Sequence, residues 1–305
     1  MAPRHGVLVV DKPAGPTSHD VVNRVRRALG ERRVGHTGTL DPFATGVLVV
    51  CIGKATRLAR FLAEGDKLYR ATVRLGFATT TDDLQGDALS APRPVHVDLE
   101  ALGRAARSLE GPLDQVPPAY SAKRVGGRRL YDLAREGEET PRLRARVHVH
   151  EFRILASRGD EVDVLVRCSP GTYVRALARD LGEKLDVGGH LTALRRVASG
   201  GFSVDDAVPG DALTPDAWQW IRPLSELLVE LPAVRLSPAG LAAVRHGKDV
   251  GPAGVAEGFP EPHAPPPPHL RLLDSGGALV GIASPRTADP PASTTLRLHP
   301  AVVLV

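Results

Sequence analysis

The chain has 305 residues, of which 42% are hydrophobic and 24% are charged, and its formal net charge is +4 with a pI near 9.3. This composition is typical of a soluble globular protein of roughly two domains, and it excludes a membrane-spanning helix, because no apolar run approaches the roughly 18 residues that a span needs. The basic pI points to a polyanionic partner, although a solvated arginine-rich surface explains the same charge.

The amino terminus does not resemble a signal peptide, because the apolar VLVV of residues 7–10 is followed at once by Asp11 and Lys12. Cys51 and Cys168 fall in predicted strands, which indicates two buried hydrophobic side chains and neither a disulfide nor a metal framework. We therefore expect a cytoplasmic protein.

The first elements in the chain are a strand and a helix. Residues 7–15 predict a short strand that ends in a turn. Thr17, with Asp20 three residues later, is typical of a capping box that begins a helix, and Gly30 fits the end of that helix. Basic side chains gather in and after this helix, at Arg24, Arg26, Arg27, Arg32 and Arg33.

The next stretch, VGHTGTLDPFATGVLVV at residues 34–50, presents one carboxylate, Asp41, on a loop rich in glycine and threonine. The loop leads into an apolar strand at residues 47–52. Pro42 restricts Asp41 to extended backbone geometry, and the glycines permit close approach of a ligand. The pattern is typical of a catalytic acid on a rigid edge, but a plain turn between a helix and a strand explains it as well.

Past this motif, residues 54–62 predict a helix and residues 69–76 predict an alternating strand that Tyr69 begins. A further helix begins at Asp98, its predicted N-cap, and runs up to Gly111. The following segment, VPPAYSAKRVGGRRLYDLAREG, mixes cations with aromatic rings as RNA-binding surfaces do, although a loop with a short surface helix is the alternative. Its cations and tyrosines are Tyr120, Lys123, Arg124, Arg128, Arg129, Tyr131 and Arg135.

Two alternating strands follow at residues 146–155 and 161–168. His148 and His150 fall on one face of the first strand, but no third ligand has suitable spacing, so we predict no metal site. The segment CSPGTYVR, residues 168–175, then leads into a helix whose apolar side chains recur on one side.

The motif GHTGTLDPFATGVL resembles the catalytic motif of the TruB-type pseudouridine synthases, which isomerise a uridine in the T loop of tRNA. The resemblance implies that Asp41 is the catalytic residue. It also implies that His36 occupies or braces the RNA loop that the flipped base has left. Lys12 and Pro13 match the family's first block, in which this pair packs beside the active site.

Further blocks in the same order extend the resemblance across most of residues 7–205. YRATVRLG and TTTDDLQG imply that Tyr69 stacks on the target base and that Asp83 contributes to the site where RNA binds. The segment from Val116 resembles a block that continues, over about residues 117–145, as an insertion that grips the tRNA arm. The RNA-binding residues implied in this insertion are Lys123, Arg124, Arg128 and Arg129.

RCSPGTYVRALARDLGEKL, with HLTALRRV after it, resembles the family's third catalytic block. The resemblance implies that Tyr173 and Arg175 lie against Asp41 and that Leu194 packs beneath the base. An arginine at contact distance lowers the pKa of a carboxyl group by roughly 1 to 3 units. We therefore expect Arg175 to keep Asp41 ionised, whereas an arginine that only begins a surface helix would leave Asp41 solvated.

From residue 233 onward the pattern changes to short strands, a helix at residues 238–245 and a proline-rich insert at residues 258–270. The order of LSPAGLAAVRHGKDV, LRLLDSGGALVGIA and LHPAVVLV resembles a PUA-type module, a small β-barrel that binds RNA. We expect this part to contribute to RNA binding or to brace the first domain.

Together these patterns predict an α+β protein: a pseudouridine-synthase fold with a mixed, largely antiparallel sheet and flanking helices at residues 1–231, and a β-barrel-like PUA domain at residues 232–305. The expected reaction is isomerisation of uridine 55 in the tRNA T loop to pseudouridine, by base flipping and Asp41-dependent breakage and re-formation of the glycosidic bond. We expect no cofactor, no metal, no membrane, no obligate protein partner and a monomer.

Two other classes of protein explain part of the sequence. A non-catalytic RNA-binding or tRNA-folding protein explains the cations but gives no reason for Asp41, Tyr69 and Arg175 to occur together. A phosphatase with an aspartate nucleophile needs a second acid two residues later, where this chain has Phe43. Whether Asp41 attacks C1′, attacks C6 of the uracil or removes the C2′ proton is left open by the sequence.

Overall fold

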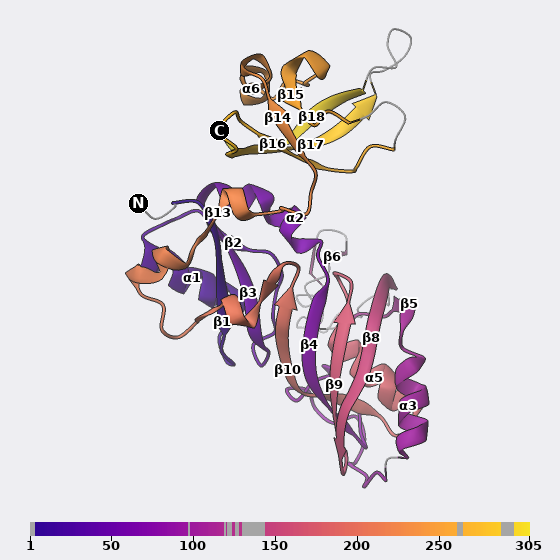
Figure 1. Cartoon of the computed structure of the whole chain (residues 1–305). Coiled ribbons are helices and arrows are strands. Elements are labelled where there is room, and N and C mark those ends of the chain that lie inside the picture. The colour runs from indigo at the N-terminus through magenta and orange to yellow at the C-terminus, as the bar shows by residue number, and fades with distance from the viewer. Residues whose placement is uncertain are drawn as a thin grey trace.

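Two β-sheets organise the chain, and Figure 1 shows the smaller sheet above the amino-terminal half of the larger one. The larger sheet has eleven strands and the smaller sheet has five. None of the described helices is long and apolar enough to cross a membrane. The computed structural model describes residues 4–96, 98–118, 120, 124–125, 128–129, 144–260, 265–287 and 296–305.

The elements fall into two groups along the chain. The larger sheet and its helices contain β1 (Gly6–Lys12), α1 (Ser18–Leu29), β2 (Val34–His36), β3 (Thr45–Ile52), the 3-10 helix η1 (Gly53–Leu58), α2 (Ala59–Ala63), β4 (Lys67–Leu75), α3 (Leu99–Arg107), β5 (Gly111–Gln115), β8 (Ala145–Arg158), β9 (Glu161–Cys168), α5 (Val174–Lys184), β10 (Gly189–Ser199), β11 (Phe202–Ser203), β12 (Val208–Pro209) and β13 (Arg222–Pro223). The smaller sheet and its helix contain β14 (Ala233–Leu236), α6 (Pro238–Arg245), β15 (Val255–Glu257), β16 (Leu270–Leu273), β17 (Leu279–Thr287) and β18 (Leu296–Val303).

The larger sheet has the strand order β12-β1-β3-β10-β4-β9-β8-β5, and β13, β2 and β11 pair beside β1, β3 and β10. Its pairings are antiparallel except those of β1 with β12 and of β3 with β10. The parallel pairing of β3 with β10 is the one that matters for the site, because it brings the strand after the Asp41 loop beside the strand that carries Leu194. The predicted α+β fold with a mixed, largely antiparallel sheet is confirmed.

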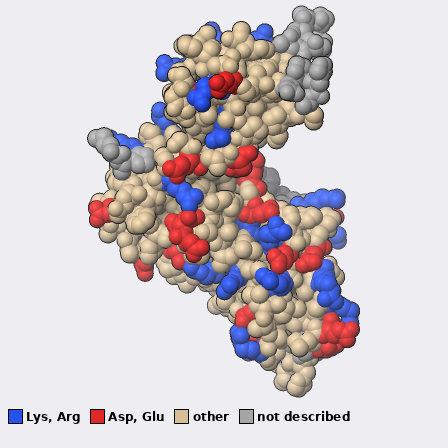
Figure 2. All heavy atoms as spheres, viewed as in Figure 1, with Lys and Arg blue, Asp and Glu red and all other residues tan. Residues whose placement is uncertain are grey.

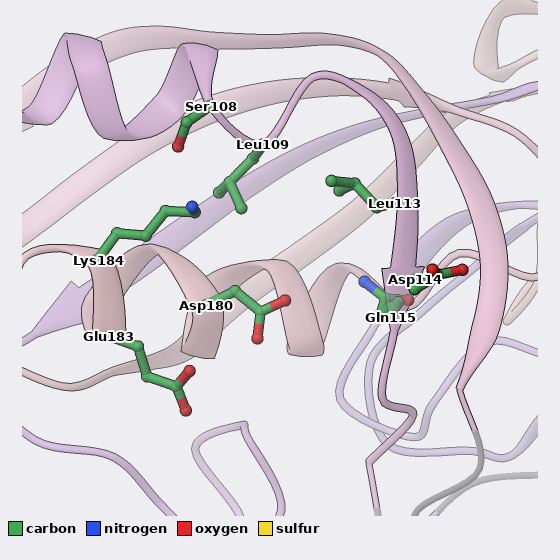
Figure 3. Close-up of a pocket in the computed structure, with 8 residues that line it drawn as sticks. All are labelled: Ser108, Leu109, Leu113, Asp114, Gln115, Asp180, Glu183 and Lys184. Atoms are coloured by element: carbon green, nitrogen blue, oxygen red, sulfur yellow. The ribbon is translucent and has the colours of Figure 1, made fainter.

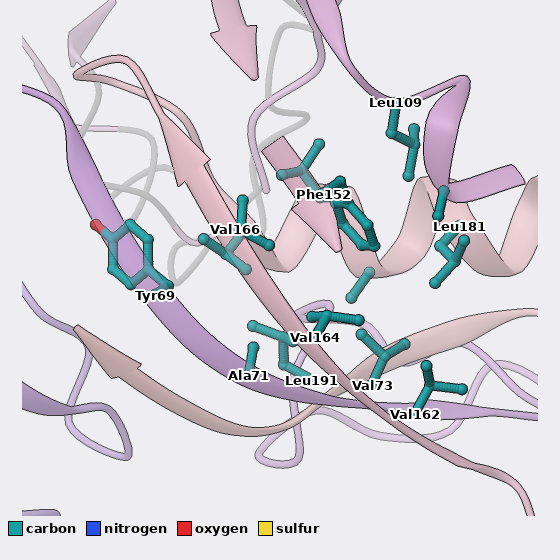
Figure 4. Close-up of a cluster of buried hydrophobic side chains, with 14 of the residues drawn as sticks. Tyr69, Ala71, Val73, Leu109, Phe152, Val162, Val164, Val166, Leu181 and Leu191 are labelled. Carbon is teal, nitrogen blue, oxygen red and sulfur yellow. The ribbon is translucent and has the colours of Figure 1, made fainter. Parts of the chain in front are cut away.

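Over β4, β9 and β8, one face of this sheet is buried beneath α3 and α5 and the other is open, whereas β1 and β3 are buried on both faces. On β4, Tyr69 and Val73 point into the buried face, whereas Arg70 and Arg74 are exposed on the other. This alternation follows from the two-residue period of a strand. Figure 4 shows the buried face, where the strand side chains meet Leu181 of α5 in one hydrophobic cluster.

The ends of α1 and α3 show where the local sequence predicted the bounds of a helix correctly and where it did not. Thr17 and Asp20 form the predicted capping box of α1, and Gly30 ends the helix with φ 63°. The helix α3 ends at its C-cap Ser108, so the prediction that it runs up to Gly111 is wrong. Gly111, with φ 89°, is instead the first residue of β5, because it already pairs with β8.

The smaller sheet has the order β15-β14-β16-β17-β18. Within the residues that the structure describes, this sheet does not close into a barrel. Closure is limited to one isolated bridge, in which Val250 and Leu298 exchange two backbone hydrogen bonds of 3.0 and 2.9 Å. Because Val250 precedes β15 and is not part of it, the two edge strands do not pair along their length.

Side chains of both sheets share one hydrophobic core. Two arginines add hydrogen bonds to β18 across the same contact: Arg57 Nη1 donates to the carbonyl of Val303 at 2.6 Å, and Arg60 Nη2 donates to that of Ala301 at 3.4 Å. The smaller sheet therefore covers apolar surface that the larger sheet would otherwise expose. Buried members of this shared core include Val7, Val47, Phe61, Leu62, Leu227, Leu279, Ile282 and Leu304.

We predict that Ile282→Ala lowers the free energy of unfolding of the whole chain by about 2 to 5 kcal/mol, because it leaves a cavity in the shared core. Ile282 is fully buried. Urea denaturation followed by tryptophan fluorescence measures the loss. Leu89→Ala is the control, because Leu89 is 65% exposed and its loss should stay below about 0.5 kcal/mol. Equal losses in the two variants would contradict a shared core.

Candidate active site

Asp41 lies on the loop between β2 and β3, and buried polar side chains form hydrogen bonds with the backbone of this loop. Lys12 of β1 is fully buried, and its Nζ donates to the carbonyls of Pro42 at 3.1 Å and Ala44 at 2.7 Å. The buried hydroxyl of Ser18 donates to the carbonyl of Leu40 and accepts from its N–H. The backbone on both sides of Asp41 is thus fixed before any ligand binds.

Arg175 of α5 meets Asp41 through two parallel contacts. Its Nε lies 3.0 Å from Asp41 Oδ2, and its Nη2 donates to Oδ1 at 3.1 Å. The side chain of Arg175 is 5% exposed, whereas that of Asp41 is 31% exposed. A bidentate pair of this kind fixes both the position and the plane of the carboxylate, so Asp41 faces solvent with its orientation already set.

The same guanidinium binds three further groups. Its Nη1 donates to the carbonyl of Thr81 at 3.0 Å and lies 3.4 Å from Asp83 Oδ2, and its Nη2 donates to the carbonyl of Tyr120 at 3.0 Å. Asp83 is 3% exposed and accepts at Oδ1 from the hydroxyl of Thr81 and from the N–H of Gln85. Arg175 therefore joins the Asp41 loop to the segment after β4 and to the segment before β6.

Burial raises the pKa of Asp41 above its ordinary value, and the Arg175 guanidinium opposes only part of this rise. Arg175 lowers the pKa of Asp41, as expected of an arginine in contact, but the net direction is upward, because the cost of removing the carboxylate from water exceeds the gain from the ion pair. A carboxylate with a raised pKa is a stronger base and nucleophile than an ordinary aspartate.

Tyr69 and Leu194 lie side by side on the buried face of the sheet. Each is 8% exposed and both belong to the hydrophobic cluster of this face, in which Figure 4 shows Tyr69 at one end. Tyr173 is the N-cap of α5. Its N–H donates to Gln115 Oε1 at 2.8 Å, and its carbonyl accepts from Gln115 Nε2 at 3.1 Å. The buried amide of Gln115 thus fixes the start of the helix that carries Arg175.

The residues that were expected to contact RNA fall into three groups. His36 is half-buried on β2, and burial lowers the pKa of its imidazole. Its Nδ1 has no hydrogen-bond partner among the described residues. The backbone of Arg124–Val125 (β6) and Arg128–Arg129 (β7) forms a two-stranded hairpin, but the side chains there are not described. Lys123 lies outside the described residues altogether.

His148 and His150, the two histidines on β8, stack with ring centroids 4.5 Å apart. His150 Nε2 lies 3.1 Å from Asp66 Oδ1. Among the described residues no cluster of three or more histidine, cysteine, aspartate or glutamate side chains could hold a metal ion.

Several site residues escaped the sequence analysis. Arg179 lies one helical turn after Arg175 on α5, and its Nη1 contacts Asp82 Oδ2 at 2.8 Å while its Nη2 donates to the carbonyl of Val116 at 3.1 Å. Its four-residue spacing from Arg175 is a signal that could have found it. Burial raises the pKa of Asp82 to about 6. Gln115 gives no such signal, because its role depends on a contact between distant segments.

A cavity of about 410 Å³ lies between the end of α3, β5 and α5 (Figure 3). Its lining does not include Asp41, Tyr69 or Arg175. Acidic side chains outnumber cations in it, so it does not suit a phosphate-bearing ligand. The lining residues are Ser108, Leu109, Leu113, Asp114, Gln115, Asp180, Glu183 and Lys184.

Two family models match the chain in succession. Residues 26–174 match the TruB family pseudouridylate synthase (N terminal domain), and residues 175–231 match the tRNA pseudouridylate synthase B C-terminal domain. Both models describe pseudouridylate synthases, and this is the class of enzyme in which they place the chain.

Two curated relatives narrow the class. A tRNA pseudouridine synthase B from Mycobacterium sp. (strain KMS) is 49% identical over 276 residues, which cover 89% of this chain and 92% of that protein. Another from Thermobifida fusca (strain YX) is 51% identical over 259 residues, which cover 82% of this chain and 87% of that protein. The chain belongs to the TruB family of pseudouridylate synthases.

Solved structures agree on the fold. A chain in the crystal structure of the archaeal box H/ACA sRNP Nop10-Cbf5 complex matches with a TM-score of 0.73 and 23% identity over 100% of this chain and 87% of that chain. A chain in a Cbf5-Nop10-Gar1 complex matches with a TM-score of 0.72 and 25% identity over 99% of this chain and 85% of that chain. At these identities the likeness supports the architecture alone.

We predict that the free energy of unfolding rises with pH between about 8 and 9, below the range in which the buried thiols of Cys51 and Cys168, whose pKa values burial raises to about 12 and about 11, oppose the rise. Burial lowers the pKa of Lys12 from 10.5 to about 8, and that of Lys67 likewise to about 8. Within this range each of these lysines binds more protons in the unfolded chain than in the folded chain, so each adds up to about 1.4 kcal/mol per pH unit. Urea denaturation across this pH range measures the slope.

Lys12→Met should remove the share of this slope that Lys12 contributes, and Lys54→Met, at a half-buried lysine of η1, should leave the slope unchanged. If Lys12→Met and the unsubstituted protein show the same pH dependence of the free energy of unfolding, burial does not lower the pKa of Lys12, and the prediction is wrong.

Proposed function

We propose that this chain isomerises a uridine of tRNA, position 55 in the T loop, to pseudouridine. The observation that carries the proposal is the bidentate pair of Asp41 with Arg175, on a loop that three elements hold rigid. The relatives from Mycobacterium and Thermobifida are named tRNA pseudouridine synthase B, which supports tRNA as the substrate. We also propose that the protein is a cytoplasmic monomer and that it needs neither a cofactor nor an obligate protein partner.

The reaction breaks the bond from N1 of uracil to C1′ and joins C1′ to C5. The C5 proton leaves and N1 takes up a proton, so the isomerisation balances without an oxidant or a reductant. Attack at C1′, attack at C6 and removal of the C2′ proton all begin from an ionised Asp41. Asp41 offers a partly exposed carboxylate for this step, and Arg175, buried behind it, holds both oxygens in place.

The target uridine lies in a folded RNA loop and must be flipped into the site, at a cost of a few kcal/mol. Stacking against Tyr69 would offset about 1 to 3 kcal/mol of this cost. Leu194 would support the base from the same face of the sheet, and the half-buried His36 would brace the loop that the base has left. Lys12, Tyr173 and Asp83 act in this proposal by positioning the loop, the helix and the guanidinium.

We further propose that residues 1–231 form the catalytic domain, that residues 117–145 within it grip the tRNA arm, and that residues 232–305 form a PUA-like RNA-binding domain. The shared core gives the last segment a second role in bracing the first. The side chains that would contact RNA in the insertion are those of Lys123, Arg124, Arg128 and Arg129.

A second cationic surface lies at the end of α1. Arg27, Arg32 and Arg33 are exposed there, and the hydrogen bond from Gly53 N–H to the carbonyl of Arg33, at 2.7 Å, brings Lys54 beside them. Among the described residues none of these four cations forms an ion pair with an acid. We call these four cations the N-terminal basic surface and propose that it binds RNA phosphates.

The open face of the larger sheet differs in this respect. Figure 2 shows basic and acidic side chains interspersed over the face that is turned to the viewer. Arg74 pairs there with Asp160 at 2.9 Å, and Arg158 pairs with Asp163 at 2.5 Å. Neutralised arginines of this kind attract phosphate less than unpaired ones.

A non-catalytic RNA-binding protein would use the same cations. It would give no role to a half-exposed carboxylate that a buried arginine holds at two points, and it would release no tritium from a tRNA transcript labelled at uracil C5. Release of that label is the test that separates the two functions.

We predict that Asp41→Asn abolishes tritium release from labelled tRNA while the dissociation constant for tRNA stays within about threefold. Asparagine keeps the outline of the side chain and removes the charge that nucleophilic or basic chemistry needs. Asp163→Asn is the matched control, because Asp163 lies on the open face, and it should remain fully active. Full activity of Asp41→Asn would overturn the mechanism.

We also predict that alanine at both Arg32 and Arg33 reduces the slope of log affinity for tRNA against log salt concentration by up to about 2, because each duplex phosphate contact contributes about 0.9. Filter binding between low and moderate salt measures the slope. Alanine at both Arg74 and Arg158 removes the same charge from the open face and should leave the slope unchanged. Equal slopes for the two double variants would show that the N-terminal basic surface does not touch the RNA.

A further inference from the structure

Arg196 lies at the centre of the site, although the proposed mechanism has not used it. It stands on β10 directly opposite Tyr69 of β4 on one side and Gly46 of β3 on the other. Like Leu194, two residues earlier, its side chain points to the buried face of the sheet, and it is 3% exposed. One arginine thus neighbours both the strand of the stacking tyrosine and the strand that follows the Asp41 loop.

The guanidinium of Arg196 binds the Asp41 loop on both sides of the carboxylate. Its Nε donates to the carbonyl of Val47 at 2.7 Å. Its Nη2 donates to that of Gly38 at 3.1 Å, and its Nη1 makes a longer contact of 3.4 Å with that of Thr39. Two of these carbonyls precede Asp41 and one follows it, so the arginine fixes the distance between the two ends of the loop. Arg196 also lies beside Tyr69: burial raises the pKa of the Tyr69 hydroxyl, and the charge of Arg196 lowers it.

Two observations set Arg196 apart from an ordinary buried arginine. First, no acid pairs with it among the described residues: the titratable groups that face it are Lys12, His36, Lys67 and Tyr69, none of which is a carboxylate. A buried cation without a counter-ion is costly. A neutral amide could hold one or two such carbonyls, whereas the planar fork of one guanidinium contacts three, on both sides of Asp41.

Second, the backbone is arranged to bring Arg196 close to the loop. A Cβ atom at Gly46 would lie 2.1 Å from the carbonyl oxygen of Arg196, and Gly46 has φ 100°, so only glycine fits there. The neighbouring Arg195 is different. Its side chain points to the open face and pairs with Asp11 through contacts of 2.9 and 2.7 Å, as a surface arginine usually does.

We propose that Arg196 is a positioning residue for the isomerisation: it holds the Asp41 loop from a strand position directly opposite Tyr69, and so sets the distance between the reacting carboxylate and the ring that receives the base. This inference rests on the proposed function. Arg196 touches neither the RNA nor the reacting atoms in this arrangement. Its loss should therefore slow the chemical step without weakening the binding of tRNA.

The test compares Arg196→Gln, Arg196→Lys and Arg195→Gln. Glutamine keeps some hydrogen bonding without charge, and lysine keeps the charge without the planar fork. Single-turnover tritium release at saturating tRNA gives the rate, filter binding gives the dissociation constant, and thermal unfolding gives the temperature below which each variant is fully folded. We expect both Arg196 variants to lose about 10- to 100-fold in rate, as displaced catalytic groups do, with dissociation constants within about threefold of the unsubstituted protein.

Arg195→Gln should keep its rate within about twofold. A rate for Arg196→Gln equal to that of Arg195→Gln, or a loss that appears only in tRNA binding, would overturn the inference. So would a loss that vanishes once the rate is measured well below the unfolding temperature, since that would mark Arg196 as important for folding alone. If Arg196→Gln does not fold, Arg196→Lys carries the same comparison. Absence of tritium release from the unsubstituted protein would instead overturn the proposed function.

Discussion

The ion pair between Asp41 and Arg175 is the contact on which the site depends. Arg175 is almost wholly buried at the start of α5, and its five donors are directed at groups from three other segments of the chain. Burial of a guanidinium lowers the free energy of unfolding unless such partners form hydrogen bonds or ion pairs with it. The carboxylates of Asp41 and Asp83 and the carbonyls of Thr81 and Tyr120 therefore depend on one another. Any change that moves α5, including loss of the Gln115 amide at its start, moves the Asp41 carboxylate as well.

The loop that carries Asp41 is stabilised by a different kind of contact. Lys12 and Arg196 bring buried positive charge to backbone carbonyls and not to carboxylates. Carbonyls satisfy these cations only in part, which agrees with the lowered pKa of Lys12. The loop is rigid before substrate arrives, and rigid placement of a reacting group is one of the largest sources of rate acceleration that a protein can supply.

The two sheets are coupled through a shared core, and this affects how the carboxyl-terminal segment should be understood. Phe61 and Leu62 of the first part pack with Ile282 and Leu304 of the second. An independent module could be tethered by a linker alone, whereas this one covers apolar surface beside β1 and β3. The strands beneath the Asp41 loop are therefore stabilised by residues that lie more than two hundred positions away in the sequence.

The sequence alone determined the alternation of β4, the capping box of α1, the family and the identity of Asp41, Tyr69 and Arg175 as candidates, because these depend on local periodicity or on a contiguous motif. Only the tertiary structure decided the net direction of the pKa of Asp41, the tethers made by Lys12, Gln115 and Arg196, and the open form of the smaller sheet. Each of these depends on which distant segments exclude water or meet, and no local pattern of residues carries that information.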